Sequence, residues 1–245
     1  MKVVFLGATK GIGRALARLM AGRGEQLFLL GRDKEDLERS ARDLEVRGAS
    51  GTVGCANCDL NDSSSFEPAL KTADGALSGF DTVVVTGGLF ATQEKLEADP
   101  AFLQKMLDVN FTGSVLFCEA ARKRLLAKGG GTLCVFSSVA GERGRKPVVL
   151  YGAAKAGLSA YLEGLDHKYR AAGLRTVCVK PGFVKTSMTE GLKPPPFAGE
   201  PEQVARIALR AIDRGTPVVY APTIWALVML VIRSLPRSVM RRVGF

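Results

Sequence analysis

A tyrosine and a lysine four residues apart form the first pair in this sequence that could carry out proton chemistry. Tyr151 and Lys155 stand at i and i+4, the spacing that places two side chains on one face of a helix. A free phenol has a pKa of about 10, too high for ready proton exchange at neutral pH. A neighbouring ammonium group favours the phenolate and is expected to lower that pKa. Tyr151 is therefore predicted to act as a general acid toward a carbonyl oxygen whose carbon receives hydride.

A hydroxyl group upstream of this pair is expected to complete the chemistry. Residues 136–141, FSSVAG, end a predicted strand, and a hydroxyl at the carboxyl end of a strand is well placed to bind a substrate oxygen. Ser137 and Ser138 are the two candidates for this role. Cys55 and Cys58 form the one close cysteine pair, without a second cysteine or histidine pair, so no metal site is expected.

A sheet must position these side chains, because short apolar runs alternate with helical patterns from the first residue onward. The predicted strands span residues 2–6, 26–30, 52–56, 81–85, 131–137, 174–180 and 217–220. The predicted helices span residues 11–23, 33–46, 63–73, 99–127, 151–172 and 201–213. Near-continuous apolar runs are typical of parallel strands that are covered on both faces. The pattern predicts an α/β fold, a Rossmann-type doubly wound parallel sheet of about seven strands, in one domain.

The turn after the first predicted strand has the composition of a phosphate-binding loop. It reads GATKGIG over residues 7–13 and leads straight into a predicted helix. Glycine lets the backbone turn sharply and approach a ligand closely. The N-terminus of the helix offers free N–H groups and a positive dipole end to a pyrophosphate. This loop, placed after the first strand, predicts a dinucleotide cofactor.

The end of the second predicted strand indicates which dinucleotide is bound. An NAD enzyme needs an acidic side chain here to accept hydrogen bonds from the ribose 2′-OH, whereas this chain has Gly31 followed by Arg32. A guanidinium group holds the 2′-phosphate of NADP, which a carboxylate would repel. Lys10, inside the glycine loop, could supply a second cation. We therefore predict NADP(H) as the cofactor.

Taken together, these motifs resemble those of the short-chain dehydrogenase/reductase family, in order and spacing, from residue 3 to about residue 186. The glycine spacing of residues 7–13 is the family's own, although Leu6 replaces its usual threonine. After the fourth predicted strand the family has Asn-Asn-Ala-Gly, and this chain has VTGG at residues 85–88 without the structural asparagine. The resemblance implies the same doubly wound fold and hydride transfer to or from a nicotinamide cofactor.

The resemblance also implies a role for each matching residue. The catalytic set is Asn110, Ser138, Tyr151 and Lys155, with Asn110 holding a water on the lysine to complete a proton relay. Asp59 matches an adenine-contacting aspartate, and Pro181, Gly182 and Thr186 match a motif that holds the nicotinamide carboxamide. The implied cofactor-binding residues are Gly7, Thr9, Lys10, Gly11, Ile12, Gly13, Arg32, Asp59, Leu60, Gly87, Asn110, Tyr151, Lys155, Pro181, Gly182, Val184 and Thr186.

Two segments outside these motifs are expected to set the substrate and its surroundings. Residues 186–199 correspond to the family's variable substrate lid, with three prolines and two possible glycine hinges. Residues 222–245 contain a run of nine apolar residues, 224–232, which is too short to span a bilayer. Arginines recur after this run at 233, 237 and 241. A helix lying in a membrane interface fits this pattern, and so does a helix docked on its own domain or on another subunit.

The tail resembles that of family members that act on lipid-linked substrates, such as the decaprenylphosphoryl-ketopentose reductases and the sphingoid-base ketone reductases. This resemblance implies an NADPH-dependent ketone reductase for a lipophilic or lipid-linked substrate. Two alternatives stay open. One is a soluble reductase of 3-oxoacyl thioesters or small ketones, and the other is a non-catalytic NADP-binding regulator.

The composition limits the partners. The formal net charge is +10, but the sequence shows neither the basic helix nor the stacking aromatic set of a nucleic-acid-binding protein, so no nucleic acid partner is expected. Five scattered cysteines, and a strand that begins at Lys2, indicate a cytoplasmic protein, with peripheral contact to the inner face of a membrane as a hypothesis for residues 222–245. Family members pair through the two long helices 99–127 and 151–172, which implies a homodimer or homotetramer.

Overall fold

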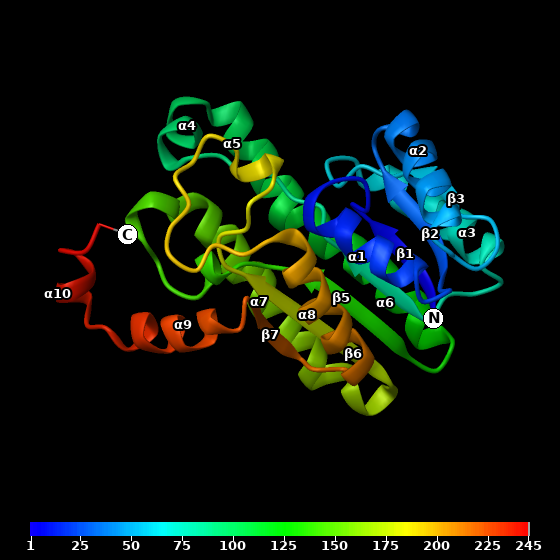
Figure 1. Ribbon diagram of the computed structural model, residues 1–245. Helices are drawn as coiled ribbons and strands as arrows, with labels where there is room; N and C mark the ends of the chain where they lie inside the picture. Colours follow the sequence, from blue (N-terminus) through cyan, green and yellow to red (C-terminus); the bar gives the residue numbers. More distant parts are fainter. Residues whose placement is uncertain (245) are drawn as a thin grey trace.

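The computed structural model describes residues 1–244 and confirms the predicted α/β architecture (Figure 1). Seven parallel strands form one sheet in the order β3-β2-β1-β4-β5-β6-β7. The strands are β1 (Lys2–Leu6), β2 (Gln26–Gly31), β3 (Gly54–Asn57), β4 (Thr82–Val85), β5 (Gly131–Phe136), β6 (Leu174–Pro181) and β7 (Val218–Ala221). The α-helices are α1 (Gly11–Ala21), α2 (Lys34–Val46), α3 (Phe66–Ala76), α4 (Gln93–Ala98), α5 (Pro100–Leu107), α6 (Gly113–Ala127), α7 (Val149–Tyr169), α8 (Pro201–Arg214), α9 (Ile224–Ser234) and α10 (Arg237–Met240).

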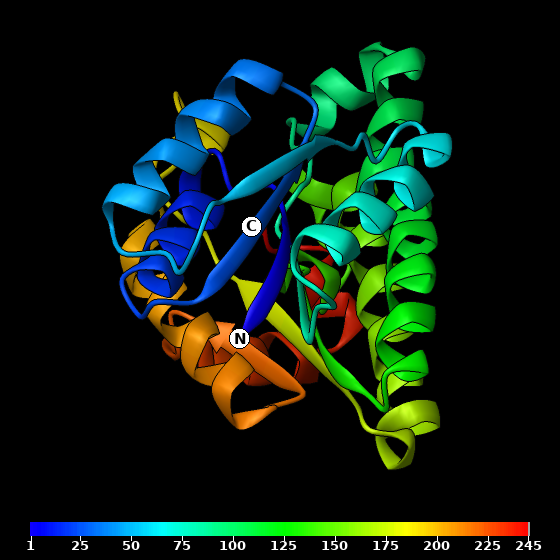
Figure 2. The ribbon, with the colours of Figure 1, turned by 90° about the vertical axis from the view of Figure 1, so that its right-hand side faces the viewer.

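Helices cover both faces of the sheet, as Figures 1 and 2 show from two directions. Helices α1, α2 and α8 pack on one face, and α3, α6 and α7 pack on the other. Because successive strand residues point to opposite faces, Val3 and Phe5 of β1 join the first core, whereas Val4 and Leu6 join the second. Both cores are apolar, which explains why the strands appear in the sequence as unbroken hydrophobic runs.

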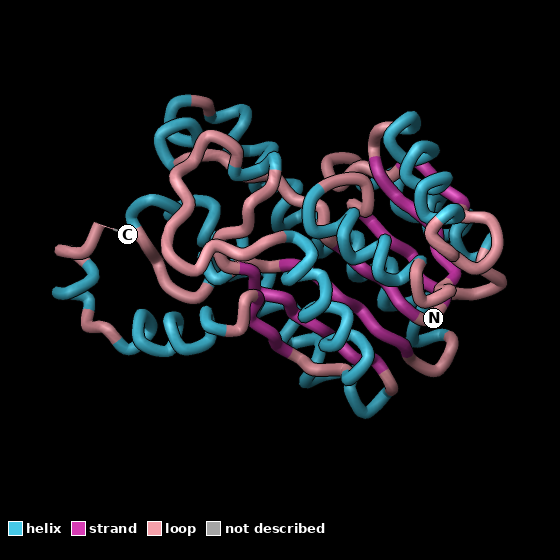
Figure 3. The backbone as a smooth tube through the Cα atoms, viewed as in Figure 1, coloured by secondary structure: helices cyan, strands magenta, loops and turns pink. Residues whose placement is uncertain are grey.

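The strand order reverses between β1 and β4, and this reversal creates the place for a ligand. β1 and β4 are paired neighbours, but the chain leaves β1 toward α1 on one face and leaves β4 toward the helices of the other face. The two loops therefore diverge at the carboxyl edge of the sheet. The long loop between β6 and α8 runs over the same edge (Figure 3).

The predicted helix over residues 99–127 is interrupted in the structure. It consists of α5, a π-helical stretch over Asp108–Thr112, and α6. A π-turn adds one residue to the helical turn, and such turns occur mostly at functional sites. Here the stretch contains Asn110, whose side chain is fully buried. Helix α4 was not predicted, because its six residues are too few to show a periodic pattern.

The C-terminal segment forms two helices at the outer edge of the molecule, beyond β7 (Figure 1). α9 ends at Ser234, and Pro236 separates it from α10 because proline lacks an N–H group and cannot continue a helix. The arginines at 233, 237 and 241 recur every four residues in the sequence. Because α9 and α10 are separate helices, these arginines do not form one row on a single helix. Throughout residues 1–244, every helix falls short of the length or the apolar content that a bilayer crossing requires.

Candidate active site

A cavity of about 340 Å³ lies at the carboxyl edge of the sheet, between the loops that follow β1, β4, β5 and β6. Its size is within the range of small-molecule sites. Thirteen of the predicted site residues line it: Gly7, Lys10, Gly11, Ile12, Gly13, Asn110, Ser138, Tyr151, Lys155, Pro181, Gly182, Val184 and Thr186. The structure thus brings together the residues expected at the phosphates, the nicotinamide and the reacting carbon. The other five lie outside the cavity lining: Thr9, Arg32, Asp59, Leu60 and Gly87.

Lys155 is almost completely buried, and its burial governs how readily the ammonium group loses its proton. Its side chain lies in the first half of α7, and its Nζ donates a hydrogen bond of 3.1 Å to the carbonyl oxygen of Phe136 at the end of β5. Nζ lies 5.9 Å from the centre of the Tyr151 ring. Burial disfavours the charged form and lowers the pKa of Lys155 to about 8. The ammonium group is therefore close to its titration point at neutral pH.

The pKa of Tyr151 moves in the direction opposite to the one predicted. Burial raises it to about 12, and the hydroxyl of Ser138 opposes this only in part. The expected lowering by Lys155 does not occur, because desolvation is the larger effect and the ammonium group is directed at the Phe136 carbonyl. The phenol consequently keeps its proton at neutral pH, which is the state that a proton donor to a carbonyl oxygen requires.

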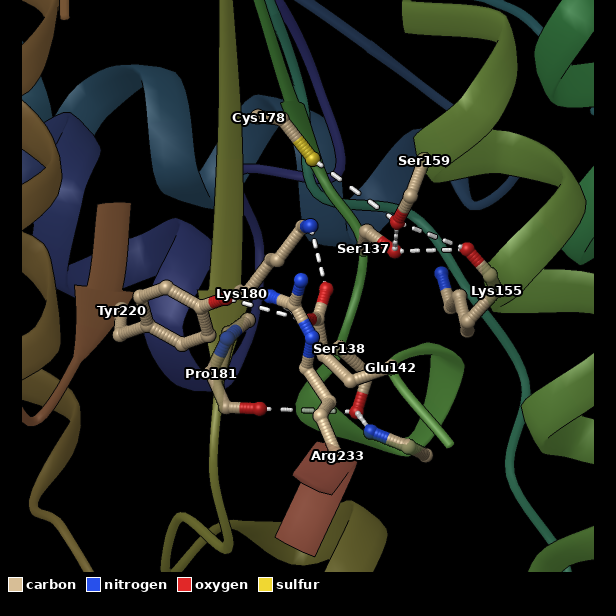
Figure 4. Close-up of polar contacts among 11 residues, drawn as sticks. Ser137, Ser138, Glu142, Lys155, Ser159, Cys178, Lys180, Pro181, Tyr220 and Arg233 are labelled. Atoms are coloured by element: carbon tan, nitrogen blue, oxygen red, sulfur yellow. Dashed lines mark hydrogen bonds and ion pairs between the residues drawn. The ribbon is translucent and has the colours of Figure 1, made fainter. Parts of the chain in front are cut away.

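The two serines at the end of β5 have different surroundings (Figure 4). The Ser137 hydroxyl donates to the main-chain carbonyl of Lys155 at 2.9 Å and lies 2.7 Å from the Ser159 hydroxyl, so it joins β5 to α7. The Ser138 hydroxyl accepts from the Ala140 N–H at 3.1 Å and lies 3.5 Å from the carbonyl oxygen of Pro181. Ser138 is thus the one in position to meet a substrate oxygen beside Tyr151.

Asn110 fixes the loop that follows β4. Its Nδ2 donates to the carbonyl oxygen of Leu89 at 2.6 Å, and its Oδ1 accepts from the Leu89 N–H at 3.1 Å. A Cβ built on Gly88 would lie 2.9 Å from Asn110 Oδ1 and 3.6 Å from Lys155 Nζ, so Gly88 leaves the space that these two side chains share. Both ends of the amide are used by the loop, and the relay role implied for Asn110 stays a prediction.

The glycine loop has the close backbone contacts that a phosphate-binding turn needs. Gly7 adopts a φ of +97°, in the region that favours glycine, and a Cβ on Gly13 would collide with the carbonyl oxygen of Gly7. Lys10, the expected second cation, forms an ion pair: its Nζ lies 3.2 Å from the carboxylate of Asp36 on α2. Arg32 is exposed after β2, and the structure gives its side chain no carboxylate partner among residues 1–244.

Asp59, which is predicted to contact the adenine, lies outside the cavity lining, and so do the predicted cofactor-binding residues Leu60 and Gly87. The Asp59 carboxylate accepts from the N–H of Asn61 at 3.0 Å, which stabilises the turn after β3. Leu60 is buried, and a Cβ on Gly87 would lie 3.2 Å from its side chain. Gly87, in the loop after β4, thus packs against the side chain of Leu60.

Comparison with known proteins agrees with this geometry. A family model described as short chain dehydrogenase matches residues 1–196. The chain belongs to the short-chain dehydrogenase/reductase family. This confirms the family predicted from the motifs, and it makes the protein an oxidoreductase that uses a nicotinamide cofactor on carbonyl or alcohol groups.

Individual relatives support the same conclusion. This short-chain dehydrogenase/reductase is 34% identical over 242 residues to an uncharacterized oxidoreductase of Mycobacterium tuberculosis, covering 98% of this chain and 96% of that protein. It is 30% identical over 221 residues to carbonyl reductase family member 4 of Danio rerio, covering 87% and 91% of the two chains. A solved structure of a short chain dehydrogenase/reductase family protein superposes with a TM-score of 0.77 at 26% identity, covering 89% of this chain and 94% of that one.

Several side chains in the cavity of this short-chain dehydrogenase/reductase were not singled out in the sequence, and three of them stand out. Phe90 packs edge-on against the Tyr151 ring at 5.1 Å between ring centres, and Arg145 and Trp225 line the cavity from the loop before α7 and from α9. Phe90 and Arg145 lie in loops without a motif, so no pattern marked them. Trp225 is the only tryptophan of the chain, and it lies in residues 222–245, for which the sequence left open a membrane interface and docking on the domain or another subunit.

Trp225 packs into the interior of the domain. Its side chain is buried with Val139 and Met229, and its Nε1 donates to the carbonyl oxygen of Phe197 in the lid at 3.2 Å. The indole lies directly on Gly182, where an added Cβ would collide with it. Gly182 therefore permits the tail, the lid and the loop after β6 to meet.

We predict that Gly182→Ala lowers the free energy of unfolding by roughly 1–3 kcal/mol, the usual cost of overpacking a buried contact. Chemical denaturation measures this change, and the fluorescence of Trp225 reports its displacement. Gly164→Ala is the matched control, because a Cβ at this position of α7 meets nothing within 4 Å. It should stabilise the helix by roughly 0.5–1 kcal/mol. Equal effects of the two substitutions would contradict the contact with Trp225.

Proposed function

We propose that this short-chain dehydrogenase/reductase uses NADPH to reduce the carbonyl group of a lipophilic substrate. The observation that carries the proposal is the meeting of Ser138, Tyr151 and Lys155 in a cavity whose remaining wall is largely apolar. The apolar side chains of that wall include Leu89, Phe90, Val139, Val148, Phe183, Met188, Leu192 and Trp225. A wall of this kind favours a substrate that carries its ketone on a hydrocarbon frame.

The residues of the chain have distinct tasks in this reaction. NADPH, held by the glycine loop after β1, would supply the hydride with its two electrons to the carbonyl carbon. Ser138 and Tyr151 bind the carbonyl oxygen, and Tyr151 gives that oxygen its phenolic proton as the negative charge develops, so that an alcohol results. Lys155, with a pKa of about 8, returns a proton toward the phenol and stabilises the phenolate that is formed briefly. Val139 and Trp225 exclude water from the reacting atoms.

The fit of the cofactor rests on the loop after β1 and on the end of β2. The collision that a Cβ on Gly13 would make with the Gly7 backbone indicates a turn built for close approach of a phosphate. At Gly31 a Cβ would lie 3.3 Å from Leu37, so the acidic side chain that an NAD ribose needs would be crowded there. Arg32 follows it with an exposed guanidinium group. These observations favour the 2′-phosphate of NADPH.

The outer face of α9 supports a further part of the proposal, peripheral contact with an anionic membrane. Leu227, Leu230 and Val231 are 60%, 62% and 55% exposed, while the opposite face of the helix is buried against the domain. The arginines of residues 237–242 follow directly. An apolar face beside a basic segment suits the boundary between acyl chains and anionic headgroups. A lipophilic substrate would then reach the enzyme from the bilayer.

Tyr151→Phe removes the proton donor and keeps the ring that packs on Phe90. We expect kcat for ketone reduction to fall by at least about a hundredfold, the range of general acid catalysis, while NADPH still binds. The loss of NADPH absorbance over a panel of ketones measures turnover. Tyr169→Phe, at the far end of α7 and outside the cavity lining, is the control. Turnover that is indifferent to Tyr151→Phe would end the catalytic proposal.

Arg32→Ala is expected to weaken NADPH binding by about tenfold, because a charge-assisted hydrogen bond to the 2′-phosphate is lost. NADH binding should not change, since NADH has no phosphate at this position. Quenching of Trp225 fluorescence or calorimetry measures both affinities, and Arg42→Ala on the exposed side of α2 serves as the control. Tighter binding of NADH than of NADPH by the unmutated protein would show that the assignment of the cofactor is wrong.

The double substitution Leu227→Gln/Leu230→Gln tests the membrane contact without touching the buried face of α9. The unmutated protein should sediment with vesicles of phosphatidylglycerol, and the variant should remain in the supernatant because its apolar face no longer inserts. Vesicles of phosphatidylcholine are the control for charge. Equal sedimentation of the two proteins, or none of either, would remove the membrane contact from the proposal.

A further inference from the structure

A second hollow lies between the loop that precedes α7 and the C-terminal helix α10. Its volume is about 590 Å³, and its lining contains five cations, Arg143, Arg145, Lys146, Arg237 and Arg241. We call this hollow the basic recess. Within residues 1–244, no aspartate or glutamate contributes to its lining or to that of the catalytic cavity.

Two of the cations hold the recess together. The Arg143 guanidinium donates to the carbonyl oxygen of Leu235 at 2.9 Å, and Lys146 Nζ donates to the carbonyl oxygen of Arg241 at 2.7 Å. These bonds fix the C-terminal segment across the loop that leads to Tyr151. The ion pairs formed within residues 1–244 do not include Arg145, Arg237 or Arg241. Gathering such charges without an anion costs electrostatic energy, which a bound anion would recover.

Arg145 connects the recess with the catalytic cavity, because its side chain lines both. Its Nε is buried, and the described part of the chain offers that atom no hydrogen-bond acceptor. An unsatisfied buried donor is costly and is rare in folded proteins. Burial also lowers the pKa of the Arg145 guanidinium, as expected for a cation that lacks a partner. The arginine is thus placed toward an acceptor that a ligand would supply, next to the reacting centre.

We propose that the basic recess binds a phosphate group of the substrate while the substrate carbonyl reaches Tyr151 in the adjoining cavity. Arginine suits this task because its planar fork of donors matches phosphate oxygens. Val149 and Met240 give the recess an apolar border that accepts an alkyl chain. The inference rests on the proposed reductase function and adds the charged group that the substrate carries. That phosphate belongs either to a lipid or to a soluble metabolite.

Calorimetry on the full chain, saturated with NADP⁺ to fill the phosphate loop, tests the site without any turnover. The probes are hexyl phosphate, inorganic phosphate and uncharged hexanol. We expect hexyl phosphate to bind about tenfold more weakly to Arg237→Gln/Arg241→Gln than to the unmutated protein. Arg206→Gln/Arg210→Gln on α8 removes the same charge from an exposed surface and should change nothing. Hexanol should not bind measurably.

The outcomes separate the sources of the phosphate and decide the proposal. Tighter binding of hexyl phosphate than of inorganic phosphate supports a lipid phosphate, and equal binding supports a soluble one. If the two charge variants and the unmutated protein bind hexyl phosphate alike, the recess is merely a solvated surface and the proposal fails, whereas the reductase function still stands on Tyr151→Phe. Inhibition of ketone reduction by hexyl phosphate must also be competitive with the ketone. Non-competitive inhibition would overturn its role in substrate binding.

Discussion

The burial of one ammonium group, Lys155 Nζ, is the constraint on which the active site depends. Removing a charge from water costs several kcal/mol, and among residues 1–244 a single carbonyl oxygen, that of Phe136, accepts a hydrogen bond from this ammonium group. The last residue of β5 and the first turns of α7 must therefore keep their relative position. Ser137 secures it, because its hydroxyl bonds to the carbonyl of Lys155 itself. The result is a lysine with a pKa of about 8, at which a side chain can exchange protons near neutral pH.

A second buried charge joins the site to the C-terminal segment (Figure 4). Burial alone would raise the pKa of the Glu142 carboxyl, but hydrogen bonds from Lys180 and Tyr220 and the charge of Arg233 hold it below its usual range. Glu142 follows β5, whereas its partners lie on β6, on β7 and at the end of α9. One carboxylate thus fixes four elements, and with them the position of Trp225 over Gly182. Loss of one partner would leave a buried charge incompletely paired.

The sequence predicted the fold, and it identified candidate reacting groups that the structure places in one cavity, because both depend on local patterns. Apolar runs of strand length mark a parallel sheet, and the pairs at i and i+4 or around glycine turns mark the residues at its carboxyl edge. The direction of the Tyr151 pKa was predicted wrongly because desolvation depends on everything packed around the ring. The π-turn at Asn110 and the inward position of Trp225 depend on contacts with Leu89 and Gly182. Contacts between residues so distant in sequence leave no periodic signal.

One end of the cavity is formed mainly by main-chain atoms and the other mainly by side chains. This difference explains why the cofactor is easier to infer from the sequence than the substrate. The end expected to bind phosphate is formed by the main chain around Gly7 and Gly13, where there is no room for a side chain. Its expected role can therefore be recognised from the spacing of the glycines in the sequence. The substrate end is made of side chains from the lid, from Arg145 and from Trp225. The family model ends at residue 196, before α9 and α10. Trp225, which completes the substrate wall, therefore lies outside the residues that the family model matches, and its part in the cavity can be inferred only from the three-dimensional contacts.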